Sequence, residues 1–159
     1  MTVTLAQQLG ARLHQRQLRV TTVESCTGGG VAAAITDIAG SSGWFDMGFV
    51  TYSNAAKQQL VGVNEFTLAK FGAVSEQVVC EMALGALERS GANIAVAVSG
   101  IAGPGGGTKD KPVGTVWFAW ATDFTTKPVT QLHKYNGGRA EVRNQSVMTA
   151  LRGLLELAG

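Results

Sequence analysis

Residues 93–99, NIAVAVS, are the segment that most constrains the fold. The run is almost continuously apolar and has the length of one strand, so both of its faces are expected to be buried. A strand of that kind lies in a sheet that has a covering layer on each side. Further strands are expected where residues are β-branched or aromatic: 18–23, 44–52, 113–122 and 129–135.

Helical patterns alternate with these strands. Leu5, Leu9 and Leu13 recur at helical spacing, and Thr4 followed by Gln7 resembles a capping box, so an amphipathic helix is expected to open the chain. Helices alternating with buried strands predict a three-layer α/β/α domain with a mostly parallel sheet, which the neighbouring strands after Val113 could make mixed. Four further helices are expected: residues 31–40, closed by Gly40; a short one capped by Asn54; one from the cap Ser75 to Gly91; and a last one with Val147, Ala150, Leu151, Leu154 and Leu155 on one side.

The composition limits the class of protein. A chain of 159 residues with 45% hydrophobic and 15% charged residues fits one globular domain, 1–159, and no stretch approaches the roughly 18 apolar residues of a membrane span. The net charge of +2 is scattered, which gives nucleic-acid binding no support. Cys26 and Cys80 lack CxxC spacing, so neither a disulfide framework nor a metal site is expected. The start of the chain has no signal-peptide pattern, and a cytoplasmic protein is expected.

The sequence TTVESCTGGG places Glu24, Ser25, Cys26 and Thr27 between a buried strand and the start of a helix. Such turns face the ligand crevice of open α/β sheets, and their free N–H groups can stabilise an oxyanion. Ser25 is therefore a candidate nucleophile. The competing interpretation is a helix N-cap, which is the commoner role of serine at such a position. The G-x-S-x-G pattern is absent and the chain has two histidines, so a base other than histidine is needed.

Lys57, in TYSNAAK, is the candidate base. A lysine can accept a proton near neutral pH when burial or a nearby cation lowers its pKa. Otherwise Lys57 is an ordinary solvated helix residue, Tyr52 is a core aromatic, and Cys26 is a small buried thiol instead of an alternative nucleophile.

Two further glycine-rich turns could hold an anion. The loop GIAGPGGGTKDKPVG contains Gly105 and Gly106 close to several cationic side chains, but it lacks the lysine signature of a Walker loop. It could cradle one phosphate or simply be a mobile surface loop. The second turn, YNGGRAE, places Gly138 and Arg139 at a helix start, where an arginine could meet an anion or be an ordinary first-turn residue.

Four motifs in this order, ESCTGG, TYSNAAK, AVSGIAGPGGGT with KPVGTV, and GGR, closely resemble the CinA carboxy-terminal-domain family of nicotinamide-nucleotide amidohydrolases. The resemblance runs from about Val20 to the final helix. It implies deamidation of nicotinamide mononucleotide to nicotinate mononucleotide and ammonia, in the recycling of pyridine nucleotides in bacteria. It places the nucleophile on Ser25 and the base on Lys57, with Tyr52, Ser99 and Arg139 in supporting roles.

A mechanism without metal or cofactor follows from that resemblance. Neutral Lys57 takes the proton of Ser25, N–H groups of Thr27, Gly28 and Gly29 bind the oxyanion, and Arg139 keeps the amine neutral by repulsion while Tyr52 and Ser99 orient it. The phosphate is expected at a glycine-rich turn: Gly105, Gly106 or Gly138. Two alternatives stay open, an inactive nucleotide-binding regulatory module and an amidase for another small amide. The oligomeric state also stays open, a homo-oligomer included.

Overall fold

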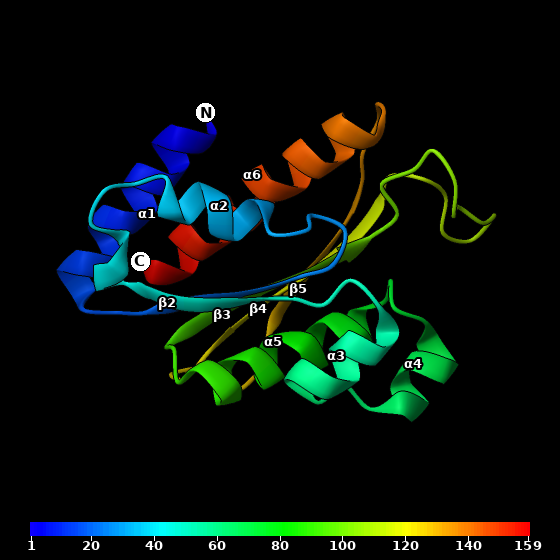
Figure 1. Cartoon of the computed structure of the whole chain (residues 1–159), viewed down its shortest axis with the longest axis horizontal. Helices are drawn as coiled ribbons and strands as arrows, with labels where there is room; N and C mark the ends of the chain where they lie inside the picture. The colour runs from blue at the N-terminus through cyan, green and yellow to red at the C-terminus, as the bar shows by residue number, and fades with distance from the viewer.

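A five-stranded sheet of order β2-β1-β3-β4-β5 runs through the middle of the molecule, and helices cover both of its faces (Figure 1). The computed structural model describes residues 1–159. Its strands are β1 (Val20–Glu24), β2 (Phe45–Val50), β3 (Ile94–Gly100), β4 (Thr115–Thr122) and β5 (Val129–Lys134). Its α-helices are α1 (Thr2–Arg16), α2 (Gly30–Thr36), α3 (Asn54–Val61), α4 (Glu65–Phe71), α5 (Glu76–Ser90) and α6 (Arg139–Ala158).

The layers follow the prediction of an α/β/α fold. Helices α1, α2 and α6 lie on one side of the sheet, and α3, α4 and α5 lie on the other (Figure 1). Strand β1 pairs in parallel with β2 and β3, whereas β4 is antiparallel to both β3 and β5. The sheet is therefore mixed. The parallel strands β1 and β3 have their carboxyl ends at the same end of the sheet. Ser25 directly follows β1 there, and Ser99 lies near the end of β3.

The alternation of large and small side chains along β3 and β4 separates two apolar layers. Val96, Val98 and Phe118 pack among the helices α1, α2 and α6. Ala97 and Ala119 belong to the cluster on the other face, where α5 contributes Val78, Val79 and Met82. Small residues on that face let α5 lie close to the sheet, so the continuous apolar run that predicted a doubly covered strand is confirmed.

Some of the predicted helix ends are correct and others are not. Ser75 caps α5 by accepting a hydrogen bond from Val78 N at 3.3 Å, and Gly91 ends that helix in a left-handed conformation with φ 71°, as expected. The cap of α3 is Ser53, which accepts from Ala56 N at 3.0 Å, so the assignment of this cap to Asn54 is wrong by one residue.

Three other boundaries differ from the prediction. The proposed capping box at Thr4 is wrong, because α1 already begins at Thr2 with no side-chain cap. Helix α2 ends at Thr36 and is followed by a 3-10 turn, Ser41–Gly43, instead of running on to Gly40. Helix α4, which Asn64 caps, was not predicted at all.

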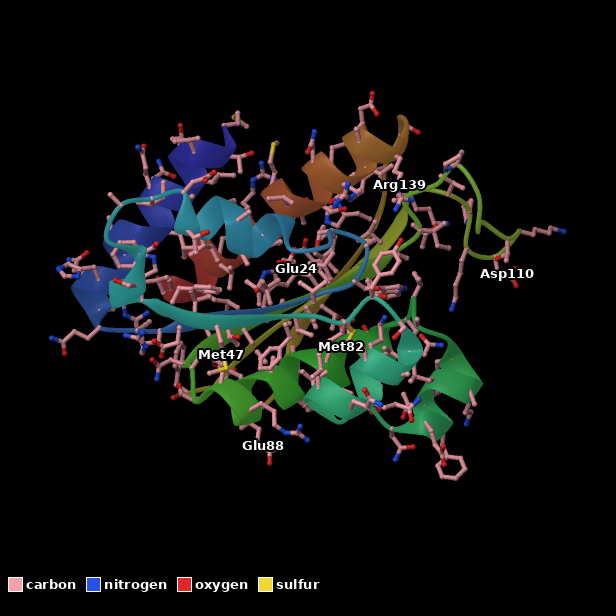
Figure 2. The ribbon with its side chains drawn as sticks, in the orientation of Figure 1. Glu24, Met47, Met82, Glu88, Asp110 and Arg139 are labelled. Atoms are coloured by element: carbon pink, nitrogen blue, oxygen red, sulfur yellow. The ribbon has the colours of Figure 1, made fainter.

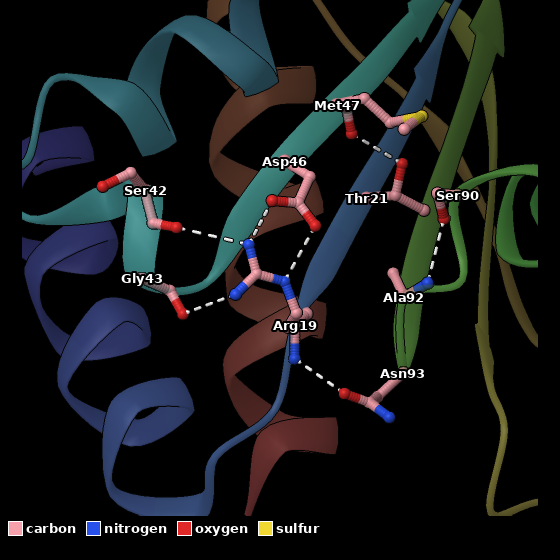
Figure 3. A network of polar contacts seen from close by, with 9 residues as sticks. All are labelled: Arg19, Thr21, Ser42, Gly43, Asp46, Met47, Ser90, Ala92 and Asn93. Atoms are coloured by element: carbon pink, nitrogen blue, oxygen red, sulfur yellow. Dashed lines mark hydrogen bonds and ion pairs between the residues drawn. The ribbon is translucent and has the colours of Figure 1, made fainter.

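The amino end of β1 is fixed by a polar network at the surface (Figure 3). The backbone N–H of Arg19 donates to Asn93 Oδ1 at 2.8 Å, its guanidinium donates to Gly43 O at 3.0 Å, and the same group forms an ion pair with Asp46. This network joins the amino ends of three neighbouring strands and leaves their carboxyl ends for the site. None of the helices has the length and apolarity needed to span a bilayer.

Candidate active site

Ser25 follows β1 directly and is buried, with 8% of its surface exposed. Its backbone N–H donates to Val98 O of β3 at 2.9 Å, so the position of the residue is fixed by the sheet. The chain then turns sharply into α2 through Gly28 and Gly29, whose φ angles are +60° and +105°. Glycine tolerates these angles because it has no Cβ.

Lys57 is the fourth residue of α3 and reaches back to Ser25. Its Nζ donates to Ser25 Oγ at 3.0 Å and to the backbone oxygens of Thr51 at 2.8 Å and Tyr52 at 3.4 Å. The side chain is only 1% exposed and has no carboxylate partner, since the one ion pair of the structure joins Arg19 to Asp46. A lysine held in this way donates to two carbonyls and aims its nitrogen at the serine hydroxyl.

Burial lowers the pKa of Lys57 from 10.5 to about 8, an effect that the neighbouring Cys26 partly opposes. Desolvation penalises the charged form of an amine, and this is the main cause here. The expected cause, repulsion from Arg139, is therefore wrong. Burial also raises the pKa of the Cys26 thiol to about 11, so little thiolate exists near neutral pH and Cys26 is the weaker candidate nucleophile.

A cavity of about 270 Å³ opens above the Ser25–Lys57 pair. It brings together all five residues to which the family resemblance gives catalytic or supporting roles: Ser25, Tyr52, Lys57, Ser99 and Arg139. The rest of its wall consists of Cys26, Asn54, Ala73, Val74, Gly100 and Ala102.

Tyr52 and Arg139 stand together at the rim of the cavity. The Tyr52 side chain is 62% exposed, and its hydroxyl accepts from Arg139 Nη2 at 3.2 Å. Arg139 Nη1 donates to Gly103 O at 2.7 Å. Tyr52 contacts Lys57 through its backbone carbonyl and not through its ring, so any orienting role of Tyr52 is exerted by the main chain. Ser99 lines the cavity but forms no hydrogen bond with Lys57, which leaves that expected orienting contact without support.

The glycines that were expected to bind substrate lie outside the cavity wall. Gly28 and Gly29 do not line the cavity, and Gly28 N–H is already donated to Ser25 O at 3.1 Å, so Gly28 is not a free oxyanion donor. Thr27 is also absent from the wall, and its hydroxyl donates to Glu24 Oε1 at 2.6 Å. Gly105 and Gly106 are exposed in the loop between β3 and β4, and Gly138 only precedes Arg139.

Several residues of the site were not assigned by the sequence. Asn54 was taken for a helix cap, although its position two residues after Tyr52 could have suggested the rim. Ala73 and Val74 come from the connection between α4 and α5, and nothing in their chemistry marks them. Glu24 was noted without a role; it is fully buried and bonded to the start of α2, and Figure 2 labels it near that helix.

No group of three or more His, Cys, Asp or Glu side chains is placed to hold a metal ion. The polar residues that line the cavity instead carry hydroxyls, a thiol, an amine, an amide and a guanidinium. This set can transfer a proton from Ser25 to Lys57 and can bind an anion at the rim.

Comparisons with known proteins place the chain in a family. The model of the CinA C-terminal domain matches residues 2–158. The nicotinamide-nucleotide amidohydrolase PncC of Escherichia coli K12 is 57% identical over 150 residues, which cover 94% of this chain and 90% of the relative. The protein of the same name from Pseudomonas putida is 52% identical over 154 residues, 97% of this chain and 95% of the relative.

A solved structure gives the same fold. The competence/damage inducible protein CihA from Agrobacterium tumefaciens has a TM-score of 0.97 and 48% sequence identity to this chain. The match covers 99% of this chain and 96% of that one.

Proposed function

Because the chain belongs to the CinA C-terminal domain family, we propose that it hydrolyses the carboxamide of nicotinamide mononucleotide with Ser25 as nucleophile and Lys57 as base. Relatives at 52% and 57% identity over nearly the whole chain are named nicotinamide-nucleotide amidohydrolases, and the chain is an enzyme of that class. The observation that carries the mechanism is the 3.0 Å contact between Lys57 Nζ and Ser25 Oγ at the floor of the cavity.

The first half of the reaction forms an acyl-enzyme. Neutral Lys57 takes the Ser25 hydroxyl proton as Oγ attacks the carboxamide carbon, and the carbonyl oxygen becomes an oxyanion. The resulting lysine ammonium then returns that proton to the leaving nitrogen. Ammonia departs as the C–N bond breaks, and the nicotinoyl group stays on Ser25 as an ester.

The second half repeats these steps with water. Lys57 takes a proton from a water molecule that attacks the ester, and then gives it to Ser25 Oγ as the C–O bond breaks. Nicotinate mononucleotide is released, and Lys57 is neutral again. No metal ion or organic cofactor takes part in the proposed cycle.

The lowered pKa of Lys57 supports its role as base. At pH 7.5 a lysine with an ordinary pKa is neutral in about one molecule in a thousand. With a pKa of about 8, Lys57 is neutral in a large fraction of the molecules at the same pH. The carbonyl oxygens of Thr51 and Tyr52 hold the amine in place. Lys57 can therefore accept the hydroxyl proton of Ser25 and later return a proton without a change of rotamer.

The position of Arg139 favours a substrate that carries a phosphate over a free amide. It is the first residue of α6, a 20-residue helix whose start has no side-chain cap, and its guanidinium lines the mouth of the cavity. The unpaired N–H groups of a helix start and a guanidinium both favour an anion. In the proposed complex the carboxamide lies against Ser25 and the phosphate lies near Arg139, instead of near Gly105 and Gly106.

The cellular setting belongs to the same proposal. The reaction would return nicotinamide mononucleotide to the pyridine-nucleotide pool of a bacterium as the nicotinate form. Cys26 and Cys80 are both free thiols, which fits the reducing conditions of the cytoplasm.

The test is incubation of the purified protein with nicotinamide mononucleotide, with ammonia and nicotinate mononucleotide measured together. Stoichiometric release of both is expected, and it should survive exhaustive EDTA treatment. Binding of the nucleotide without release would instead favour the regulatory module. Faster ammonia release from another small amide would favour the broader amidase, and activity lost to EDTA but restored by zinc would contradict the metal-free cycle.

A further inference from the structure

The loop that follows β1, residues 25–29, is called here the nucleophile loop, and most of its peptide groups are already occupied. Ser25 O accepts from Gly28 N at 3.1 Å, and Thr27 O accepts from Gly30 N at 3.0 Å. The N–H groups of Cys26, Thr27 and Gly29 donate to no other residue, and the Cys26 N–H contacts only its own thiol. Of these three residues only Cys26 lines the cavity, directly beside Ser25.

Arg143 of α6 binds the nucleophile loop from outside. Its Nε donates to Cys26 O at 3.1 Å, and its Nη2 donates to Thr27 O at 3.2 Å. Arg143 has no carboxylate partner, so the two carbonyl oxygens are its fixed contacts. The planar guanidinium sets the orientation of two consecutive peptide groups at once, which a lysine cannot do with its single nitrogen.

Glu24 binds the same loop from inside. The residue directly before Ser25, it is fully buried and forms no ion pair. Its carboxylate accepts from Thr27 Oγ1 at 2.6 Å, and from Val31 N at 2.8 Å and Ala32 N at 3.0 Å in the first turn of α2. The helix start compensates the buried charge, and the three bonds join β1, the loop and α2 into one rigid unit.

We propose that the Cys26 N–H binds the oxyanion formed on Ser25, and that Glu24 and Arg143 are positioning residues that hold this N–H in place. The inference rests on the proposed function and assigns roles that the Ser25–Lys57 pair alone does not require. An N–H that is fixed before the reaction stabilises the developing charge without the cost of reorganisation. Neither Glu24 nor Arg143 lines the cavity, so both act through the loop backbone.

Three conservative changes test the proposal, Glu24→Gln, Arg143→Lys and Arg143→Met, with Arg152→Met as the matched control on an exposed position of the same helix. Removal of one oxyanion donor typically lowers kcat by a factor of about 100 to 1,000, and misplacement of a donor that is still present should cost less. We expect kcat to fall about tenfold or more in Glu24→Gln and Arg143→Met, and less in Arg143→Lys, with KM almost unchanged. Arg152→Met should match the wild type.

A second measurement separates positioning from a structural role. Sulfur is a weaker hydrogen-bond acceptor than oxygen, so a fixed N–H donor should make the enzyme prefer the carboxamide of nicotinamide mononucleotide over the thiocarboxamide analogue. The ratio of the two kcat values should move toward one in Glu24→Gln and Arg143→Met. A role limited to stability would reduce the amount of active enzyme, and would lower both rates by the same factor.

The outcomes are distinct. An unchanged oxygen-to-sulfur ratio in folded variants, as judged by circular dichroism, overturns the positioning roles while an active wild type leaves the proposed function intact. A wild type that releases no ammonia overturns the proposed function and this inference with it.

Discussion

Two glycine-rich segments, the nucleophile loop (residues 25–29) and the glycine-rich loop between β3 and β4 (residues 101–114), look alike in sequence and differ in how their backbones are held. In the nucleophile loop the carbonyl oxygens of Ser25, Cys26 and Thr27 all accept hydrogen bonds. In the glycine-rich loop, residues 104–107 form no backbone hydrogen bond and are all exposed. Figure 2 shows Asp110 at the outer end of this loop, far from the buried Glu24.

The difference teaches that glycine content alone does not identify a binding segment. The nucleophile loop needs glycine because the chain must turn with positive φ at Gly28 and Gly29 while Thr27 O stays bonded to Arg143 of α6 and to Gly30 N of α2. The glycine-rich loop touches the site only at its base, where Gly103 O accepts from Arg139 and Ala102 lines the cavity. Function is therefore expected in the nucleophile loop, whose backbone carbonyl oxygens are bonded while an N–H group beside the cavity is left for the substrate.

The largest effect should come from the nucleophile loop. Ser25→Ala should lower turnover of nicotinamide mononucleotide by at least about a thousandfold, because covalent attack has no substitute. The protein should remain folded, since loss of a serine that only capped a helix would cost about 1 kcal/mol of stability and little activity. Steady-state kinetics and thermal unfolding of the same preparation measure both quantities.

Cys26→Ser is the control for this change, because it keeps a small polar side chain one residue away. It should retain a turnover number close to that of the wild type. If Cys26→Ser is inactive while Ser25→Ala works normally, the thiol is the nucleophile.

The next effect concerns Lys57, which holds the nucleophile loop to α3. Lys57→Met should lower kcat by about a hundredfold or more, as expected for loss of a general base. In the wild type, kcat/KM should rise with pH and level off above about pH 8, since the neutral amine is the active form and burial lowers its pKa to about 8. A rate that does not vary between pH 6.5 and 9 would contradict the role of Lys57 as base.

The lowered pKa of Lys57 also makes the free energy of unfolding depend on pH. The folded pKa of about 8 lies below the unfolded value of 10.5, so the unfolded chain binds more protons between these two pH values. The free energy of unfolding of the wild type, relative to Lys57→Met, should therefore rise from pH 8 to pH 10.5 and stay flat below pH 8. Urea titrations of both proteins at a series of pH values measure this difference.

A smaller effect is expected at Arg139, which donates to Gly103 O of the glycine-rich loop and lines the cavity together with Ser25. Arg139→Ala removes the proposed phosphate contact and should raise KM for nicotinamide mononucleotide about tenfold or more, as for loss of a charge-assisted hydrogen bond. Nicotinamide riboside, which lacks the phosphate, should show almost no change in KM. An equal rise in KM for both substrates would contradict a contact between Arg139 and the phosphate.

The smallest effect compares the two loops directly through Gly→Ala changes. At Gly28, with φ +60°, a Cβ would lie 3.3 Å from Arg143 Nη2, so Gly28→Ala should cost about 1–2 kcal/mol of unfolding free energy. At Gly105 a Cβ would meet nothing within 4 Å, and Gly105→Ala should change stability by less than about 0.5 kcal/mol. Chemical denaturation measures both; equal effects would remove the distinction between the loops.

Much of the fold and the central pair of the site could be predicted because the signals are local. The apolar run 93–99 required a sheet covered on both faces, and ESCTGGG after a strand required a turn at its carboxyl end. Ser75 and Gly91 specify a helix by their own conformational preferences, and the structure confirms both ends.

The features of the site that could not be predicted depend on contacts between segments far apart in the sequence. The low pKa of Lys57 comes from burial under several elements and not from the nearest arginine in the motifs. The carbonyl oxygens of Cys26 and Thr27 in the nucleophile loop are bound by Arg143, which lies 117 residues from Cys26 along the chain. The wall formed by Ala73 and Val74 depends on how the connection between α4 and α5 packs, and no local pattern encodes that position.

The most direct test of the central claim is detection of the acyl-enzyme. The wild type is mixed with nicotinamide mononucleotide, quenched with acid within one turnover, digested and analysed by mass spectrometry. The account predicts that the peptide carrying Ser25 gains the mass of nicotinamide mononucleotide minus ammonia, as an ester on Ser25 that Ser25→Ala does not form. An adduct on Cys26, or full turnover with no adduct at any time point, would contradict it.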